Sequence, residues 1–151
     1  MAYAKVMKGT RLLIKVGDGA DPEVFAHPCL INSARGITFS AGTTEDYIPD
    51  CDDPDLLQAV IRTKNSYSAA INGAGVLHTP SVEEYFEWLK DPDTKNIQVL
   101  LNAVALADGG GHFAGAFHLT SFEISGDREG YSQCSIELQS SGALTWVDAS
   151  S

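Results

Sequence analysis

Apolar and polar residues alternate with a period of two along most of this chain, which is typical of strands with one buried face. In the clearest case Leu12, Ile14 and Val16 share one face, and Gly17-Asp18-Gly19 then predicts a hairpin turn. The parity changes near Ser121, which predicts a β-bulge. The alternating segments fall at about residues 11–16, 24–25, 37–39, 66–77, 97–103, 113–124, 134–138 and 143–147. We therefore expect about seven strands.

One segment has helical periodicity instead. Thr79-Pro80 supplies an N-cap and a proline at the first helical position, and Asp91-Pro92 ends the segment. The apolar residues Val82, Tyr85, Phe86 and Leu89 recur at i, i+3, i+4 and i+7. We expect a helix over Thr79 to Asp91 whose apolar stripe covers a sheet. The 151 residues then form one domain, a mainly β fold (a β-sandwich or partly closed barrel) with one flanking α-helix.

The alternation breaks down between Ala41 and Asn65, which predicts a long loop or arm at about residues 43–64. This segment is strongly acidic, and Leu56, Leu57, Val60 and Ile61 near its end predict either a turn of helix or an anchor on a partner. Its candidate contact residues are Thr44, Glu45, Asp46, Asp50, Asp52, Asp53, Asp55, Leu56 and Leu57. If copies associate head to tail, the basic residues Lys5, Lys8, Arg11 and Lys15 are the expected complement.

The formal net charge of -10 argues against tight binding of nucleic acid or of an anionic membrane, because both depend on Lys and Arg. We expect neither a signal peptide nor a membrane anchor, since no apolar run has the required length. The three cysteines, Cys29, Cys51 and Cys134, are odd in number and widely spaced, so we expect them to be reduced. These features predict a soluble intracellular protein.

No motif for a nucleophile, a phosphate loop or a zinc helix occurs, so we expect neither an enzyme nor a cofactor. Two weaker metal signals exist. His112 and His118 would share a strand face, but no third ligand has a recognisable spacing. The cluster of Asp50, Asp52, Asp53 and Asp55 suits calcium chemically but departs from the EF-hand pattern. A solvated acidic loop is the simpler interpretation.

The order of these parts resembles the major tail tube proteins of long, non-contractile phage tails and of gene transfer agents. The resemblance covers nearly the whole chain, from GTRLLIKVGDG through GITFSAGTTEDY to the C-terminal EGYSQCSIELQSSGALTW. Its most specific piece is SAAINGAGVL, which leads directly into the predicted helix.

The resemblance implies a structural virion protein that assembles in the host cytoplasm into hexameric rings, which stack into a tube for DNA delivery. The expected partners are further copies of itself and the tape-measure, tail terminator and distal tail proteins, and DNA would pass without specific binding. The arm would reach a neighbouring subunit or ring. An acidic lumen is also implied, and the candidate acids are Glu123, Asp127, Glu129 and Glu137. The competing hypothesis is a soluble β-sandwich that binds carbohydrate or protein, with calcium at the acidic loop.

Overall fold

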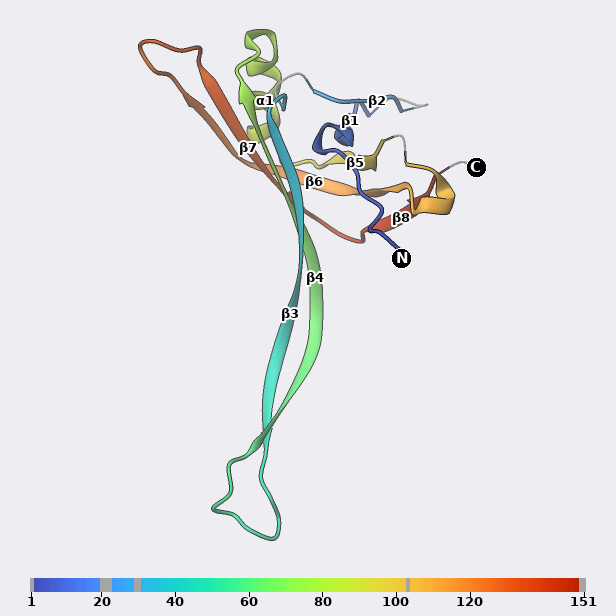
Figure 1. Ribbon diagram of the computed structural model, residues 1–151. Coiled ribbons are helices and arrows are strands. Elements are labelled where there is room, and N and C mark those ends of the chain that lie inside the picture. Colours follow the sequence, from blue (N-terminus) through green and yellow to red (C-terminus); the bar gives the residue numbers. More distant parts are fainter. Residues whose placement is uncertain (1, 20–22, 29–30, 103, 150–151) are drawn as a thin grey trace.

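The computed structural model describes residues 2–19, 23–28, 31–102 and 104–149. Its described strands form one antiparallel sheet of eight, in the order β2-β1-β5-β6-β7-β4-β3, with β8 paired to the start of β6 (Figure 1). The strands are β1 Leu12–Gly17, β2 Phe25–Ala26, β3 Ala34–Ile48, β4 Ala59–Val76, β5 Lys95–Leu101, β6 Gly111–Ser125, β7 Gln133–Ser140 and β8 Thr145–Asp148. The mainly β class with one helix is confirmed.

The sheet curls until β3 comes close to β1, but it does not close into a barrel. Its two ends are β2 and β3, which are not paired with each other in the part of the chain that the structure describes. Arg35 on β3 bridges the gap by donating to the backbone carbonyls of Thr10, at 3.2 Å, and of Leu12. The described strands therefore form a single curled sheet that resembles a partly closed barrel.

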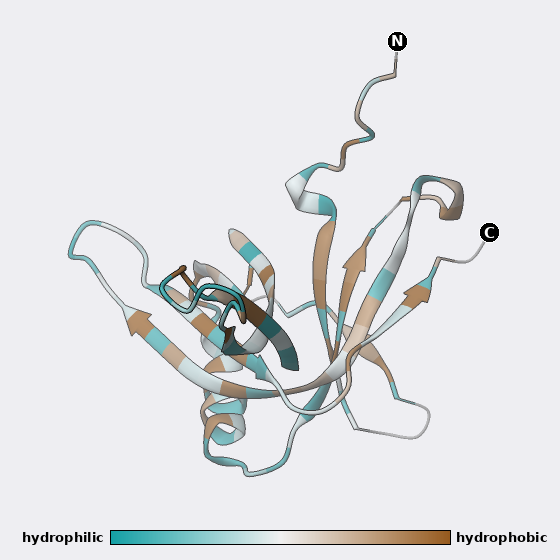
Figure 2. Cartoon of the chain, turned by 90° about the horizontal axis from the view of Figure 1, so that it is seen from below, coloured by the Kyte–Doolittle hydropathy of each residue, from teal (hydrophilic) through white to brown (hydrophobic). Residues whose placement is uncertain are grey.

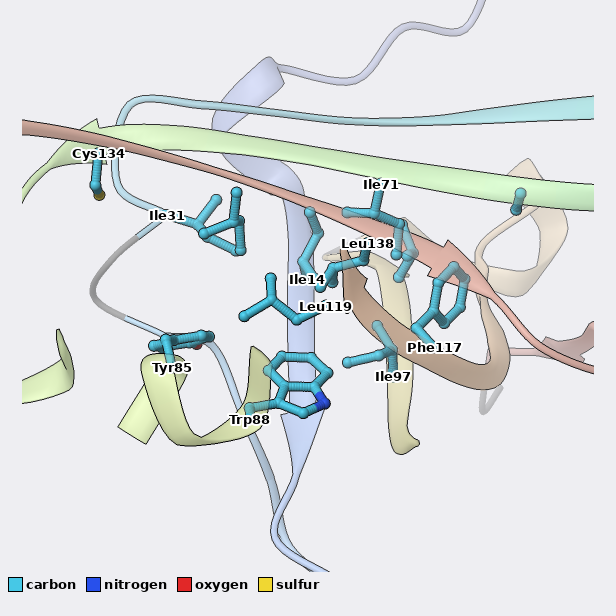
Figure 3. Close-up of a cluster of buried hydrophobic side chains, with 13 residues drawn as sticks. Ile14, Ile31, Ile71, Tyr85, Trp88, Ile97, Phe117, Leu119, Cys134 and Leu138 are labelled. Atoms are coloured by element: carbon cyan, nitrogen blue, oxygen red, sulfur yellow. The ribbon is translucent and has the colours of Figure 1, made fainter. Parts of the chain in front are cut away.

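The core lies inside this curl. The largest fully buried side chains include Ile14 of β1, Ile71 of β4, Ile97 of β5, Phe117 of β6 and Leu138 of β7 (Figure 3). Each occupies the apolar parity of its strand, so the alternation in the sequence correctly identified the inward positions. The predicted bulge is also confirmed, because the pairing of β6 with β7 shifts between Leu119 and Ser121.

Helix α1 (Val82–Lys90) packs on this sheet after a 3-10 turn at Thr79–Ser81. Tyr85 and Trp88 are 5% and 3% exposed, and the Tyr85 ring lies 6.2 Å from that of Phe122 on β6. The predicted stripe was partly wrong, because Phe86 and Leu89 face solvent. Tyr85, which was part of the predicted stripe, and Trp88, which was not, lie one turn apart and set the buried face. The predicted cap is shifted too, since Thr79 lies in the 3-10 turn.

The segment predicted to be a loop or arm does project from the body, but it is a paired hairpin and not an irregular loop. Strand β3 continues through Ile48 and β4 begins at Ala59, so the two strands form a long hairpin that projects from the body (Figure 1). Only residues 49–58 connect them, and the helical turn considered for Leu56 to Ile61 was wrong, since Val60 and Ile61 belong to β4. The backbone ladder extends well beyond the core.

Candidate assembly surfaces

The free part of the hairpin is the most prominent surface of the molecule. The first ten residues of β4, Ala59–Ser68, are all exposed, and burial begins at Ala69. At about 3.3 Å per residue, this exposed stretch is roughly 30 Å long. We call the free hairpin, residues 41–67, the arm. It is held mainly by the β3–β4 backbone ladder, with one ion pair between Arg62 Nε and Glu45 Oε1 at 3.0 Å.

A bulge marks the base of the arm. The pairing shifts between Gly42 and Thr43, which leaves Asn65 without an opposite residue. Asn65 Nδ2 donates to Thr44 Oγ1 at 2.8 Å, and its Oδ1 accepts from Ser66 Oγ at 3.3 Å. These side-chain bonds fix the local twist and therefore the direction of the strands that follow.

The distal half of the arm is apolar although nothing in this chain covers it. Tyr47, Ile48, Val60 and Ile61 are exposed on the two faces of the hairpin, and Leu57 in the connection is 97% exposed. Single exposed apolar residues are ordinary, but a group concentrated at the end of a projecting arm is typical of an interaction surface.

The connection itself is acidic. Asp50 Oδ1 accepts from the backbone N–H of Asp52 at 2.8 Å, and Asp53 Oδ1 accepts from that of Asp55 at 3.1 Å. These carboxylates organise the turn. Among the described residues, no group of three or more His, Cys, Asp or Glu side chains is arranged to hold a metal ion, so the considered calcium cluster does not converge. We call residues 45–58 the acidic tip.

The basic residues that were expected to complement this tip are not gathered in one place. Lys5 and Lys8 lie in the extended segment before β1, Arg11 ends the 3-10 turn at Gly9–Arg11, and Lys15 lies within β1. Lys15 follows the buried Ile14 and therefore points to the opposite face of the sheet. Only the first three are close in sequence on one exposed segment.

The N-terminal segment, residues 2–11, lies over one end of the sheet. Lys5 Nζ donates to Asp108 Oδ1 at 2.6 Å, and this hydrogen bond raises the pKa of Lys5 above its ordinary value. A groove beside this bond is lined by Lys5, Val6, Met7, Leu101, Val104 and Asp108. Val6 is 89% exposed and Tyr3 is 82% exposed, so this segment combines apolar and basic side chains on an open surface.

The sheet face that points away from the core, formed by β3, β4, β7 and β6, carries small and polar side chains. Cross-strand pairing places Glu137 between Asn72 and Ser121, and Glu123 beside Ser135. These residues line a shallow depression on the face. Of the four acids expected to line a lumen, Glu123 and Glu137 lie on this face, whereas Asp127 and Glu129 lie in the turn between β6 and β7.

The outer edge of β3 is available for pairing. In the described part of the chain, β3 pairs only with β4, so one side of its 15 residues presents free backbone groups. Long unpaired edges are usually protected in monomeric proteins, because they pair readily with another chain. In the same part of the chain, no helix is long and apolar enough to cross a membrane.

Comparison with known proteins gives a consistent family. The family model described as "Phage tail tube protein" matches residues 6–146. The fold is similar to that of a chain in the tail of an empty gene transfer agent particle with C6 symmetry (TM-score 0.72, 24% identity, 94% of this chain and 99% of that chain). No curated protein matches this sequence.

Two more distant structures have the same fold. One is the SPP1 tail tube (TM-score 0.57, 13% identity, 95% of this chain and 80% of that chain). The other is in the sheath–tube complex of an extracellular contractile injection system, PVC (TM-score 0.59, 16% identity, 94% and 93%). At such low identity these similarities establish the fold alone.

Proposed function

The chain belongs to the phage tail tube protein family and is a structural protein of a virion tail tube, and from this premise we propose that six copies close into a ring and that rings stack through their arms. The observation that carries the proposal is the 15-residue strand β3, which has a free edge along the body and a free arm beyond it. Edge pairing would continue the sheet from copy to copy around the ring. The C6 symmetry of the similar gene transfer agent tail supports the number six.

Stacking would use the arm, which extends away from the body of its own copy (Figure 1). A contact between two different surfaces of one protein does not close on itself along an axis, so it repeats and generates a tube. The apolar residues Tyr47, Ile48 and Leu57 would become buried against the next ring. Leu56 would add to this apolar contact, and Thr44, Glu45, Asp46 and the four aspartates of the connection would contribute its polar part.

The polar face that carries Glu123 and Glu137 would line the channel. Carboxylates repel phosphates, and small neutral polar groups do not attract them. Neither supplies a cation to replace the counterions of DNA. DNA would then pass without specific binding. Asp127 and Glu129, in the β6–β7 turn, would lie near the rim of a ring.

The remaining partners follow from the same role. The tube would grow in the host cytoplasm on a distal tail complex, enclose a tape-measure protein and end at a tail terminator. The mature location would be the virion tail. This account assigns the protein no reaction and no cofactor.

The test is negative-stain electron microscopy of the purified protein and of an armless variant in which Asn-Gly replaces residues 45–62. The replacement joins Thr44 to Thr63, which are paired opposite each other, so the bulge and the body remain intact. We expect tubes from the unchanged protein, and separate rings or monomers from the variant, with a circular dichroism spectrum that is still of the β type and a cooperative thermal transition of the body. Normal tubes from the armless variant would contradict the role of the arm. Persistent monomers of the unchanged protein, stabilised by calcium, would favour a binding module.

A second experiment tests the channel face. In a double variant, Glu123→Lys with Glu137→Lys, we expect tubes of normal diameter that retain added DNA at low salt and release it at high salt. A matched variant, Glu83→Lys with Glu87→Lys on the exposed side of α1, should not retain DNA inside the tube. Equal retention by both variants would contradict the assignment of this face.

A further inference from the structure

The acidic tip has a specific complement within the same molecule. Residues 45–58 contain six acids and no base, and Leu57 projects from them almost fully exposed. The N-terminal segment has the opposite character, since residues 2–11 contain Lys5, Lys8 and Arg11 and no acid. It also exposes the apolar residues Tyr3 and Val6. The two surfaces therefore carry opposite charges, and both expose apolar side chains.

The two surfaces of one copy cannot meet each other. The tip lies at the far end of the arm, whereas the N-terminal segment joins the body at β1 (Figure 1). Seen from below, the N-terminal segment also leaves the body on the side away from the arm (Figure 2). Any contact between them must therefore join two copies, and it is of the head-to-tail kind that propagates along an axis.

Other exposed surfaces of the chain suit the tip less well. The exposed flank of α1 offers Phe86 and Leu89, but Glu83 and Glu87 border it, and its one lysine, Lys90, already pairs with Glu87 at 3.3 Å. The polar sheet face carries Glu123 and Glu137. A second tip would bring the aspartates of both connections together. Like charges oppose each of these contacts, whereas the N-terminal segment attracts the tip.

Resting on the proposed function, we propose that the acidic tip of one copy docks on the N-terminal segment of a copy in the next ring. Leu57 inserts at the groove between Val6, Met7, Leu101 and Val104, and the aspartates of the connection face Lys8 and Arg11. In a single copy, the exposed bond from Lys5 to Asp108 already joins the segment to the body beside this groove. Lys15, on the other face of β1, takes no part.

Cross-linking tests the contact in the assembled protein, because the tip carries a natural exposed thiol, Cys51. In a Cys29→Ser background, Val6→Cys places a second thiol in the N-terminal segment. Mild oxidation of tubes should give a ladder of linked chains on a non-reducing gel, with the V6C thiol joined to Cys51 by peptide mapping. Two matched controls, V6C with Cys51→Ser and Val24→Cys with Cys51 retained, should remain monomeric on the gel. Val24 is also exposed but lies beside β2.

Charge reversal supplies an independent readout. Lys8→Glu should raise the protein concentration needed for tube formation several-fold, and Asp53→Lys should do the same. The two reversals combined should restore assembly toward that of the unchanged protein, whereas Lys90→Glu on α1 should have no effect. The pair thus tests the contact without relying on loss of assembly alone.

The outcomes separate the two proposals. If the unchanged protein forms tubes but V6C does not link to Cys51 above the level of V24C, the docking site is wrong and the tube function stands. If the combined reversal assembles no better than either single reversal, the proposed charge pairing is wrong. If the unchanged protein forms no tubes, the proposed function fails first, and this contact fails with it.

Discussion

Strand β4 passes through two environments, and the comparison explains how one chain can be both a folded domain and an assembly unit. From Ala69 to Val76 its residues alternate between buried and outward positions, as expected for a strand over a core. From Ala59 to Ser68 every residue is exposed, although the backbone ladder with β3 is unbroken apart from the bulge. The body is stabilised by side-chain burial, and the arm mostly by backbone hydrogen bonds.

An isolated two-stranded hairpin is marginally stable in water. The apolar side chains of the arm, such as Tyr47 and Ile61, therefore stabilise little within one copy, but their burial in an assembly would contribute about 25 cal/mol for each Å² removed from water. This difference predicts that the arm depends on a partner and that the body does not.

The largest difference should come from the same substitution at two positions of β4. Ile71 is fully buried, so Ile71→Ala should lower the free energy of unfolding by about 2–5 kcal/mol. Ile61 is half-exposed on the arm, so Ile61→Ala should change it by less than about 0.5 kcal/mol. Urea denaturation of unassembled protein, followed by tryptophan fluorescence, measures both. Equal losses would mean that the arm belongs to the cooperative core.

Ile61→Ala should nevertheless weaken assembly, because its side chain belongs to the apolar half of the arm. Electron microscopy should therefore rank the two variants in the opposite order. Ile61→Ala should impair tube formation more than Ile71→Ala does, provided that the Ile71→Ala protein remains folded. If Ile61→Ala assembled at the concentration of the unchanged protein, the apolar character of the arm at this position would serve no contact.

A smaller effect should come from adding one methyl group to a glycine in each region. A Cβ at Gly73 would lie 2.8 Å from a methyl carbon of the fully buried Ile31, so Gly73→Ala should destabilise the body by about 1–3 kcal/mol. A Cβ at Gly42, at the base of the arm, would meet the Ser66 hydroxyl at 2.4 Å, and this exposed group can rotate away at the cost of its bond to Asn65 Oδ1. Gly42→Ala should therefore cost less in thermal unfolding. The opposite order would show that the bulge is rigid.

The same division explains which parts of the fold could be predicted from the sequence. Alternation revealed the strands of the body because one face of each is buried, as at Ile14 and Val16 in β1. It failed at Thr43, Thr44, Glu45 and Asp46, where both faces of the hairpin are solvated and no burial pattern exists. The β-branched residues Val60, Ile61 and Thr63 were the available signal for a strand there.

The helix and the surfaces show two other limits. The predicted stripe of Val82, Tyr85, Phe86 and Leu89 had helical spacing, but spacing alone could not show that Phe86 and Leu89 face solvent and that Trp88 is buried beside Tyr85. The arm could be located from its acids and apolar residues. The groove beside Lys5 could not, because it is formed by segments around Val6 and Val104 that are far apart in sequence.

The cross-strand ion pair in the arm should give a smaller effect still. Arg62 and Glu45 are both well exposed, so their coupling in a double-mutant cycle with alanine should be about 0.2–1 kcal/mol. The effect should appear in the hydrogen exchange of arm amides and leave the body amides unchanged. A comparable loss of protection at Ile71 would contradict the separation of arm and body.

The smallest effect on stability should come from chemical modification of Cys51. This thiol is exposed in the tip, whereas Cys134 on β7 is buried and its burial raises the pKa of its thiol. Iodoacetamide should therefore modify Cys51 rapidly in the folded protein, with a change in the free energy of unfolding below about 0.5 kcal/mol. Cys134 should react only after the body opens, because the thiolate is the reactive form.

The pH dependence of this reaction has a definite sign. Because the folded state raises the pKa of Cys134, its contribution to stability is fully present below the ordinary thiol pKa and is lost as the pH rises through the raised value. Protection of Cys134 should therefore weaken in mildly alkaline solution, while labelling of Cys51 needs no opening at any pH. Mass spectrometry of timed samples measures both thiols in one experiment. Equal protection of the two thiols in unassembled protein would mean that the tip is covered by its own chain, and the arm would then have no free surface to offer a partner.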